Sequence, residues 1–243
     1  MIISLVNQKG GVGKTTTAVN LASSLARKNH RVVLVDLDPQ GSATKWHDVE
    51  GNQAFEILNR SNLSAASDLG ALSTAYDYVV VDAPPAINEL TRNILEVSDV
   101  TVIPVTPSSL DLWACTDTLK MAKEVRKKHP GLEIKFLINR KIPGTRAGRE
   151  IRQTLDEFNT GVINTELCQR VAYVDAMKYG VSVMQFAPGS KAAQEIEQLC
   201  DEIITGSDQA ADAAEMEEED INPIYALYQE ETNNILFRSF QSH

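Results

Sequence analysis

The chain has 243 residues, of which 43% are hydrophobic, and a formal net charge of −10. This length and apolar content suit one globular domain with a sizeable core. Three scattered cysteines argue against a disulfide framework or a cysteine metal site. No apolar run approaches the roughly eighteen residues of a membrane span, and the apolar segment directly after Met1 leaves no room for a signal sequence. We therefore expect a cytoplasmic protein.

The first predicted strand, at residues 2–7, leads directly into a glycine-rich loop. That loop reads Gln8-Lys9-Gly10-Gly11-Val12-Gly13-Lys14-Thr15-Thr16 and opens a predicted helix at residues 15–29. Backbone N–H groups at the positive end of a helix bind polyphosphates, and glycine allows the backbone to approach them closely. The strict phosphate-loop pattern has glycine where this chain has Gln8, but the strand–loop–helix context is the required one. The loop therefore predicts a nucleotide-phosphate site.

Two further apolar runs end in carboxylates. Residues 32–36 and 78–82 are predicted strands that end at Asp36 and Asp82, and Asp38 follows the first of them. Ligands of open α/β sheets lie at the carboxyl ends of the strands, so these acids should lie beside the glycine-rich loop. A single aspartate at a strand end is often only a helix cap or a turn residue. Their occurrence together with the loop favours a site for phosphate and a divalent cation.

The rest of the chain alternates between apolar strands and helix-length segments. Further strands are predicted at residues 100–105 and 134–139, and helices at residues 89–97, 110–129, 149–158 and 191–204. Short extended segments at residues 55–58 and 161–163 are weaker strand candidates. Strands that alternate with helices form parallel sheets with both faces covered. We predict an α/β fold with a mostly parallel, twisted sheet and helices on both faces.

A second lysine in the loop, Lys9, distinguishes it from an ordinary phosphate-binding loop. With Lys14 it forms the deviant motif of the ParA/MinD ATPases, and the chain resembles the small ParA branch of that family, which has a P-loop NTPase-like fold. The resemblance implies that Lys14 holds the β and γ phosphates and that Lys9 reaches the partner's nucleotide in an ATP-bound homodimer. It also implies that Asp38 orients the attacking water. The alternative for Lys9 is a solvated loop lysine.

The same resemblance implies the remaining site residues and the cofactors, ATP and Mg²⁺. Thr15 would bind Mg²⁺ directly and Asp82 through water, while Asp36 would support Asp38. Asn139 and Pro188 would touch adenine, although an asparagine at a strand end is also a common capping residue. The nucleotide contacts implied in this way are Gly10, Gly11, Val12, Gly13, Lys14, Thr15, Thr16, Asp36, Asn139 and Pro188.

The resemblance further implies a slow, Mg²⁺-dependent ATPase that dimerises with ATP, binds DNA non-specifically and positions a cargo. The cargo could be a plasmid, a chromosome region or a protein assembly such as a microcompartment or a chemoreceptor cluster, with a ParB-like or cargo-adaptor protein as the stimulating partner. One alternative is a MinD-like positioning ATPase on a membrane or protein track, although the acidic C-terminus lacks the basic helix that a membrane requires. Another is a nucleotide-gated binding module with negligible turnover.

Charge is distributed unevenly along the chain. Residues 206–243 hold nine acids and one base, so the net charge of −8 in this segment leaves only −2 for residues 1–205. Basic residues in the body are candidates for DNA contact, with a solvated helix face as the alternative. They are Arg140, Lys141, Arg146, Arg149 and Arg152, which lie close together in the sequence, and Arg170 and Lys178, which the family resemblance adds.

The sequence predicts three units. Residues 1–205 form the ATPase domain, residues 206–220 an acidic linker, and residues 221–243 an apolar C-terminal segment. The acidic segment lacks aromatic and β-branched residues, which is typical of disordered linkers. The apolar segment is a possible docking helix for the body, a second subunit or a partner protein.

Overall fold

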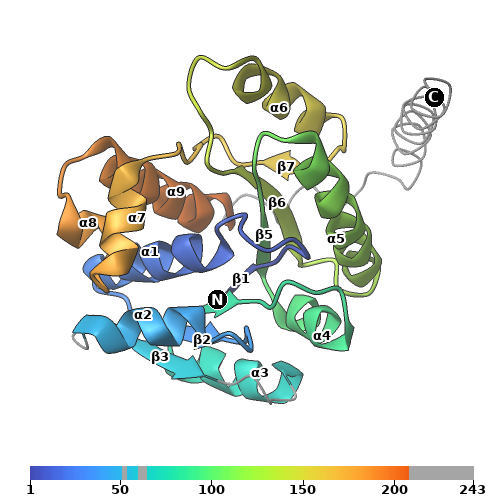
Figure 1. The fold of residues 1–243 in the computed structure, drawn as a ribbon. Coiled ribbons are helices and arrows are strands. Elements are labelled where there is room, and N and C mark those ends of the chain that lie inside the picture. The colour runs from blue at the N-terminus through green and yellow to red at the C-terminus, as the bar shows by residue number, and fades with distance from the viewer. Residues whose placement is uncertain (51–53, 60–64, 208–243) are drawn as a thin grey trace, which may run out of the picture.

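A seven-stranded sheet in which all strands are parallel forms the centre of the protein (Figure 1). The computed structural model describes residues 1–50, 54–59 and 65–207. The strand order is β3-β2-β4-β1-β5-β6-β7, which places β1 at the centre of the sheet. The strands are β1 Ile2–Leu5, β2 Val32–Asp36, β3 Glu56–Asn59, β4 Tyr78–Asp82, β5 Val100–Val105, β6 Glu133–Ile138 and β7 Gly161–Val162.

Helices cover both faces of the sheet and bury its side chains in two apolar layers. The helices are α1 Lys14–Arg27, α2 Ser42–Glu50, α3 Ala65–Ala75, α4 Glu89–Val97, α5 Ser109–Lys128, α6 Arg146–Asp156, α7 Val171–Lys178, α8 Val183–Phe186 and α9 Lys191–Ser207. One layer packs under α1, α2, α7, α8 and α9, and the other packs under α3, α4, α5 and α6. In β2, Leu34 points into the first layer and Val33 and Val35 into the second. Burial on both faces explains why the central strands are continuous apolar runs.

The predicted fold class and the main strands are confirmed. The short candidates at residues 55–58 and 161–163 correspond to β3 and β7, the second of which pairs over only two residues. The sequence analysis did not predict α2, α3, α7 or α8. In α7, Val171 and Val174 are 73% and 70% exposed while Tyr173 is buried, so apolar residues on both sides of this helix hide its periodicity.

The predicted linker and C-terminal segment fall almost wholly outside the described residues, which end at Ser207 in α9. Within residues 1–50, 54–59 and 65–207, no helix combines the length and the apolar character needed to cross a bilayer.

Candidate functional site

The glycine-rich loop connects the carboxyl end of β1 to the first turn of α1. Gly11 and Gly13 have φ angles of +81° and +91°, a backbone conformation that favours glycine. Gly13 caps α1, and its carbonyl accepts the N–H of Thr17 at 2.9 Å. A Cβ atom on Gly13 would lie 2.3 Å from Nδ2 of Asn139, so a side chain at this position would have to displace the amide of Asn139. The loop therefore has the backbone geometry and the helix N-terminus that bind phosphate.

Lys14 is buried in this loop with only 6% of its surface exposed. Its Nζ donates to the carbonyl oxygen of Lys9 at 3.1 Å. Burial lowers the pKa of Lys14, and the nearby carboxylates of Asp82 and Asp38 partly oppose that shift. A buried ammonium group with few partners is suited to bind the oxygens of a polyphosphate.

Thr15 and Asp82 form the second polar pair of the site. The hydroxyl of Thr15 donates to Oδ2 of Asp82 at 2.6 Å. The other oxygen of Asp82, Oδ1, is buried without a hydrogen-bond partner among the described residues. Burial raises the pKa of Asp82 to about 7, against the hydrogen bond from Thr15, which lowers it. An unsatisfied buried carboxylate oxygen beside a threonine hydroxyl fits a divalent cation, which would stabilise the ionised form.

This cation site has few protein ligands. The described residues contain no cluster of three or more His, Cys, Asp or Glu side chains that could hold a metal alone. Mg²⁺ is commonly bound through one or two protein oxygens together with substrate phosphates and water. The pair formed by Thr15 and Asp82 fits that mode of binding.

Asp36 and Asp38 lie at the carboxyl end of β2 and differ in their surroundings. Asp36 is fully buried and accepts the backbone N–H of Asp38 at 3.2 Å and the N–H and hydroxyl of Thr44 at 2.9 and 3.1 Å. It therefore holds the turn that carries Asp38. Asp38 lines the cavity next to the loop, and its carboxylate accepts the N–H of Gln40 at 2.9 Å.

Lys9 points away from this cavity and towards α5. Its ammonium group forms an ion pair with Asp111, whose side chain is 7% exposed and also accepts the hydroxyl of Thr106. Gln8, which replaces the usual glycine, donates from its side chain to the carbonyl of Ala114 at 2.9 Å. Gln8, where this chain departs from the strict pattern, thus anchors the loop to α5. The sequence analysis did not foresee Asp111, because nothing in its local sequence connects it to Lys9.

A cavity of about 530 Å³ extends from the loop towards α7 and α9. This volume suits a small-molecule ligand. Asn139 lines it and donates to the carbonyl of Val12 at 2.7 Å. Val12 itself does not line the cavity and its side chain is buried, so its contact with the nucleotide stays a prediction. Pro188 is exposed between α8 and α9 and does not line the cavity, so its contact with adenine stays a prediction. The lining comprises Gly10, Gly11, Gly13, Lys14, Thr15, Thr16, Thr17, Asp38, Ser42, Pro85, Asn139, Arg140, Leu167, Cys168, Gln169, Arg170, Tyr173, Val174, Met177 and Ile196.

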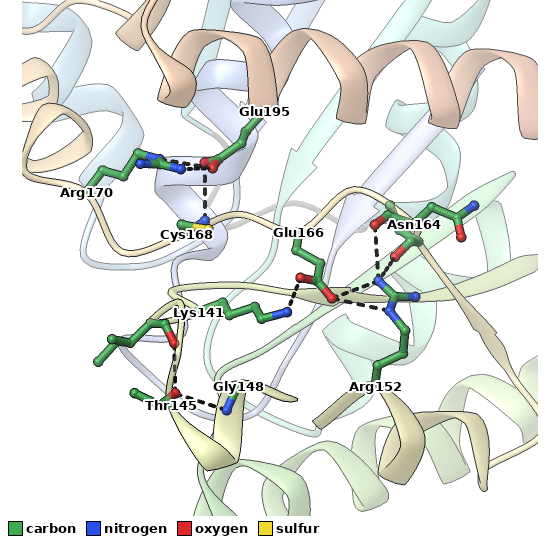
Figure 2. Close-up of polar contacts among 11 residues, drawn as sticks. Lys141, Thr145, Gly148, Arg152, Asn164, Glu166, Cys168, Arg170 and Glu195 are labelled. Carbon is green, nitrogen blue, oxygen red and sulfur yellow. Dashed lines mark hydrogen bonds and ion pairs between the residues drawn. The ribbon is translucent and has the colours of Figure 1, made fainter. Parts of the chain in front are cut away.

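Three of the predicted DNA-contact residues are held by carboxylates (Figure 2). Lys141 and Arg152 both pair with Glu166, and Arg152 also donates to the carbonyl of Ile163 at 2.9 Å. Arg170 pairs with Glu195 at 2.5 Å. The side chains of Lys141, Arg152 and Arg170 are 21%, 31% and 28% exposed, so these three cations are partly buried as well as paired.

The other four predicted DNA-contact residues are exposed. Arg146 pairs with Glu150 at 2.8 Å but keeps 84% of its side chain exposed, and Arg149 donates to the carbonyl of Gly144 at 2.7 Å. Arg140 donates to the carbonyl of Gly11 in the glycine-rich loop at 3.0 Å. Lys178 lies 5.7 Å from the ring centroid of Tyr179.

Comparison with known proteins agrees with this geometry. Residues 3–183 match the model of the CobQ/CobB/MinD/ParA nucleotide-binding domain. The chain belongs to this family. It is 35% identical over 187 residues to the maintenance of carboxysome distribution protein A of Halothiobacillus neapolitanus, an alignment that covers 75% of this chain and 86% of that protein. It is 33% identical over 218 residues to the chromosome-partitioning ATPase Soj of Thermus thermophilus, covering 76% and 88%.

The family fold also appears among solved structures. The septum site-determining protein MinD of Pyrococcus horikoshii, solved with Mg-ADP, superposes with a TM-score of 0.69 at 19% identity and covers 87% of this chain and 99% of that chain. A likeness at this identity supports the fold alone. Membership of the family rests on the match to residues 3–183 and on the two relatives above 30% identity.

Proposed function

We propose that the protein is an ATP-hydrolysing switch of the ParA type that dimerises with ATP and positions or partitions a cargo. One observation carries the proposal: the two lysines of one loop have opposite placements. Lys14 lines the cavity, whereas Lys9 lies outside it and is held by Asp111. A lysine on the phosphate loop that does not reach its own cavity would reach the nucleotide of a second subunit once it leaves Asp111.

The proposed chemistry follows from charge. Thr15 and Asp82 would hold Mg²⁺, which would neutralise negative charge on the phosphates. Lys14 binds the β and γ phosphates, and Asp38 orients the attacking water from its place in the cavity lining. Lys9 of the second subunit adds positive charge where negative charge develops on the phosphoryl oxygens in the transition state. The catalytic set is Lys9, Lys14 and Asp38.

The track in this proposal is non-specific DNA, contacted by exposed cations. These are Arg146 and Arg149 of α6, Lys178 of α7, and Arg140, which also donates to the carbonyl of Gly11 in the glycine-rich loop. The ion-paired residues Lys141, Arg152 and Arg170 would contribute less, because DNA would have to compete with their carboxylates. If a dimer contacts six or more phosphates, the affinity should fall about 10³-fold between 50 and 200 mM salt.

Two relatives, which are named for carboxysome distribution and chromosome partitioning, support a positioning role. The cargo in this proposal is recognised through a ParB-like or adaptor protein that stimulates turnover. The protein acts in the cytoplasm and associates with the nucleoid when it is bound to ATP, without a membrane partner.

The test measures ATP turnover and the retention of plain duplex DNA by the same protein preparation. Turnover should be slow and should require Mg²⁺, and DNA retention should require ATP and fall steeply with salt. Lys9→Ala should lose turnover and keep nucleotide binding. Full turnover in Lys9→Ala would refute the role in the partner subunit, and turnover without DNA retention would point to a protein or membrane track. Nucleotide binding with negligible turnover would favour a binding module.

A further inference from the structure

The segment that connects β7 to α7 forms one wall of the nucleotide cavity. The N–H of Leu167 donates to the carbonyl of Ile138 at 2.9 Å, and its carbonyl accepts the N–H of Lys141 at 3.0 Å. The N–H of Gln169 then donates to the carbonyl of Lys141 at 2.8 Å. These bonds extend the sheet beyond β6, next to Asn139 and the phosphate loop. The wall is therefore an ordered strand-like edge rather than an irregular loop.

Two glutamates of α9 hold the two ends of this connecting segment. Glu202 accepts four hydrogen bonds, from the N–H and side chain of Asn164 and of Thr165, at 2.6 to 3.0 Å. Neither of those residues lines the cavity. Glu195 lies seven residues earlier, which corresponds to two helical turns and the same side of α9. It contacts the other end of the segment.

Glu195 contacts three residues that all line the cavity, and Figure 2 shows its contacts with two of them, Cys168 and Arg170. Its carboxylate accepts the backbone N–H of Cys168 at 3.2 Å and the guanidinium of Arg170 at 2.9 and 2.5 Å. It also accepts the hydroxyl of Tyr173 at 3.1 Å. The side chain of Glu195 is only 12% exposed. One buried carboxylate thus sets the position of a backbone group, a cation and an aromatic ring on the same wall.

We propose that Glu195 is a positioning residue for the nucleoside side of the cavity. This inference rests on the proposed nucleotide function. Glu195 does not line the cavity itself and acts through Cys168, Arg170 and Tyr173. The phosphate-binding residues belong to the loop and to α1, and none of them contacts Glu195 among the described residues. In this proposal Glu195 holds Arg170 in the part of the cavity wall that faces the nucleoside.

Two ligands separate this role from a general effect on folding. ATP occupies both the phosphate loop and the wall, whereas inorganic tripolyphosphate can use only the loop. Glu195→Gln removes the charge that holds Arg170, so the dissociation constant for ATP should rise about tenfold. The constant for tripolyphosphate should stay within twofold of the wild-type value, and kcat at saturating ATP should also be unchanged.

Glu202→Gln is the matched control, because it weakens the same segment at the end remote from the cavity. It should lower the urea midpoint and leave both dissociation constants unchanged. If Glu195→Gln weakens ATP and tripolyphosphate equally, or weakens neither, the inference is overturned. If Glu195→Gln does not fold, Arg170→Lys should show the same selective loss of ATP affinity, because it keeps the charge and loses the two-pronged contact. Failure of the wild-type protein to bind either ligand would instead refute the proposed nucleotide function.

Discussion

The ion pair between Lys9 and Asp111 predicts that freeing Lys9 will strengthen ATP-dependent dimerisation. In the described structure the ammonium group of Lys9 is held on α5 of its own chain. If Lys9 must leave Asp111 to reach a second subunit, this contact opposes dimerisation. Asp111→Asn removes the charge, keeps the size of the side chain and should release the lysine.

The magnitude follows from the burial of the two partners. Asp111 is 7% exposed and Lys9 is 36% exposed, so water screens only one side of the pair. Exposed pairs contribute about 0–1 kcal/mol and hydrogen bonds to charged groups about 1.5–3 kcal/mol. A free energy of about 1–2 kcal/mol for this half-buried ion pair corresponds to a change of about 5- to 30-fold in the equilibrium constant for each subunit. Because a dimer releases two lysines, its dissociation constant should fall roughly 25- to 900-fold.

Sedimentation equilibrium with Mg²⁺ and a non-hydrolysable ATP analogue measures this constant directly. Asp117→Asn is the matched control: Asp117 accepts the side chain of Gln8 from the same loop at 3.2 Å and is exposed. That variant should dimerise as the wild-type protein does. Equal dissociation constants for Asp111→Asn and wild type would refute the reasoning. At low protein concentration Asp111→Asn should also hydrolyse ATP faster, with the difference lost once all of the protein is dimeric.

Three further predictions concern the loop and its acids. Gly13→Ala should weaken nucleotide binding at least tenfold in a fluorescence titration, because its Cβ would collide with Asn139 and its φ is +91°, whereas Gly70→Ala, in α3 with nothing within 4 Å and outside the cavity lining, should bind normally. The pKa of Asp82 is raised to about 7 in the folded state, so the folded protein holds a proton that the unfolded chain releases. In urea titrations without nucleotide or Mg²⁺, stability should therefore fall as pH rises from about 4 to 7, by at most about 4 kcal/mol, and Asp82→Asn should lose this slope. If the stability of Asp82→Asn depends on pH as that of the wild-type protein does, the argument from the burial of Asp82 is contradicted. Asp38→Ala should bind ATP, accumulate as a dimer and turn over poorly; normal steady-state hydrolysis would remove Asp38 from the catalytic set.

Much of the fold was predictable because its signals are local in the sequence. Continuous apolar runs identified the buried strands, and their alternation with helices indicated a parallel sheet. The short helices α7 and α8 escaped prediction because tertiary contacts, rather than an amphipathic pattern, hold them. In α8, a helix of only four residues, Val183 and Met184 are buried in the apolar layer and the N–H of Val183 donates to the side chain of Asn20 in α1 at 2.8 Å.

The sequence alone also predicted which residues of the proposed phosphate site lie together. Residues 8–16 run from the loop after β1 into α1, and Asp36 and Asp82 end the adjacent strands β2 and β4, with Asp38 two residues beyond β2, so the parallel topology brings them together. The structure decided which charged residues are paired. Lys9 and Asp111 are 102 residues apart, and Arg170 and Glu195 are 25 apart. The sequence shows how many basic residues a segment contains, but only the packed fold places a particular carboxylate within a few ångströms of each one. The pairing is decided there because Coulomb attraction and desolvation depend on distance and burial rather than on order along the chain.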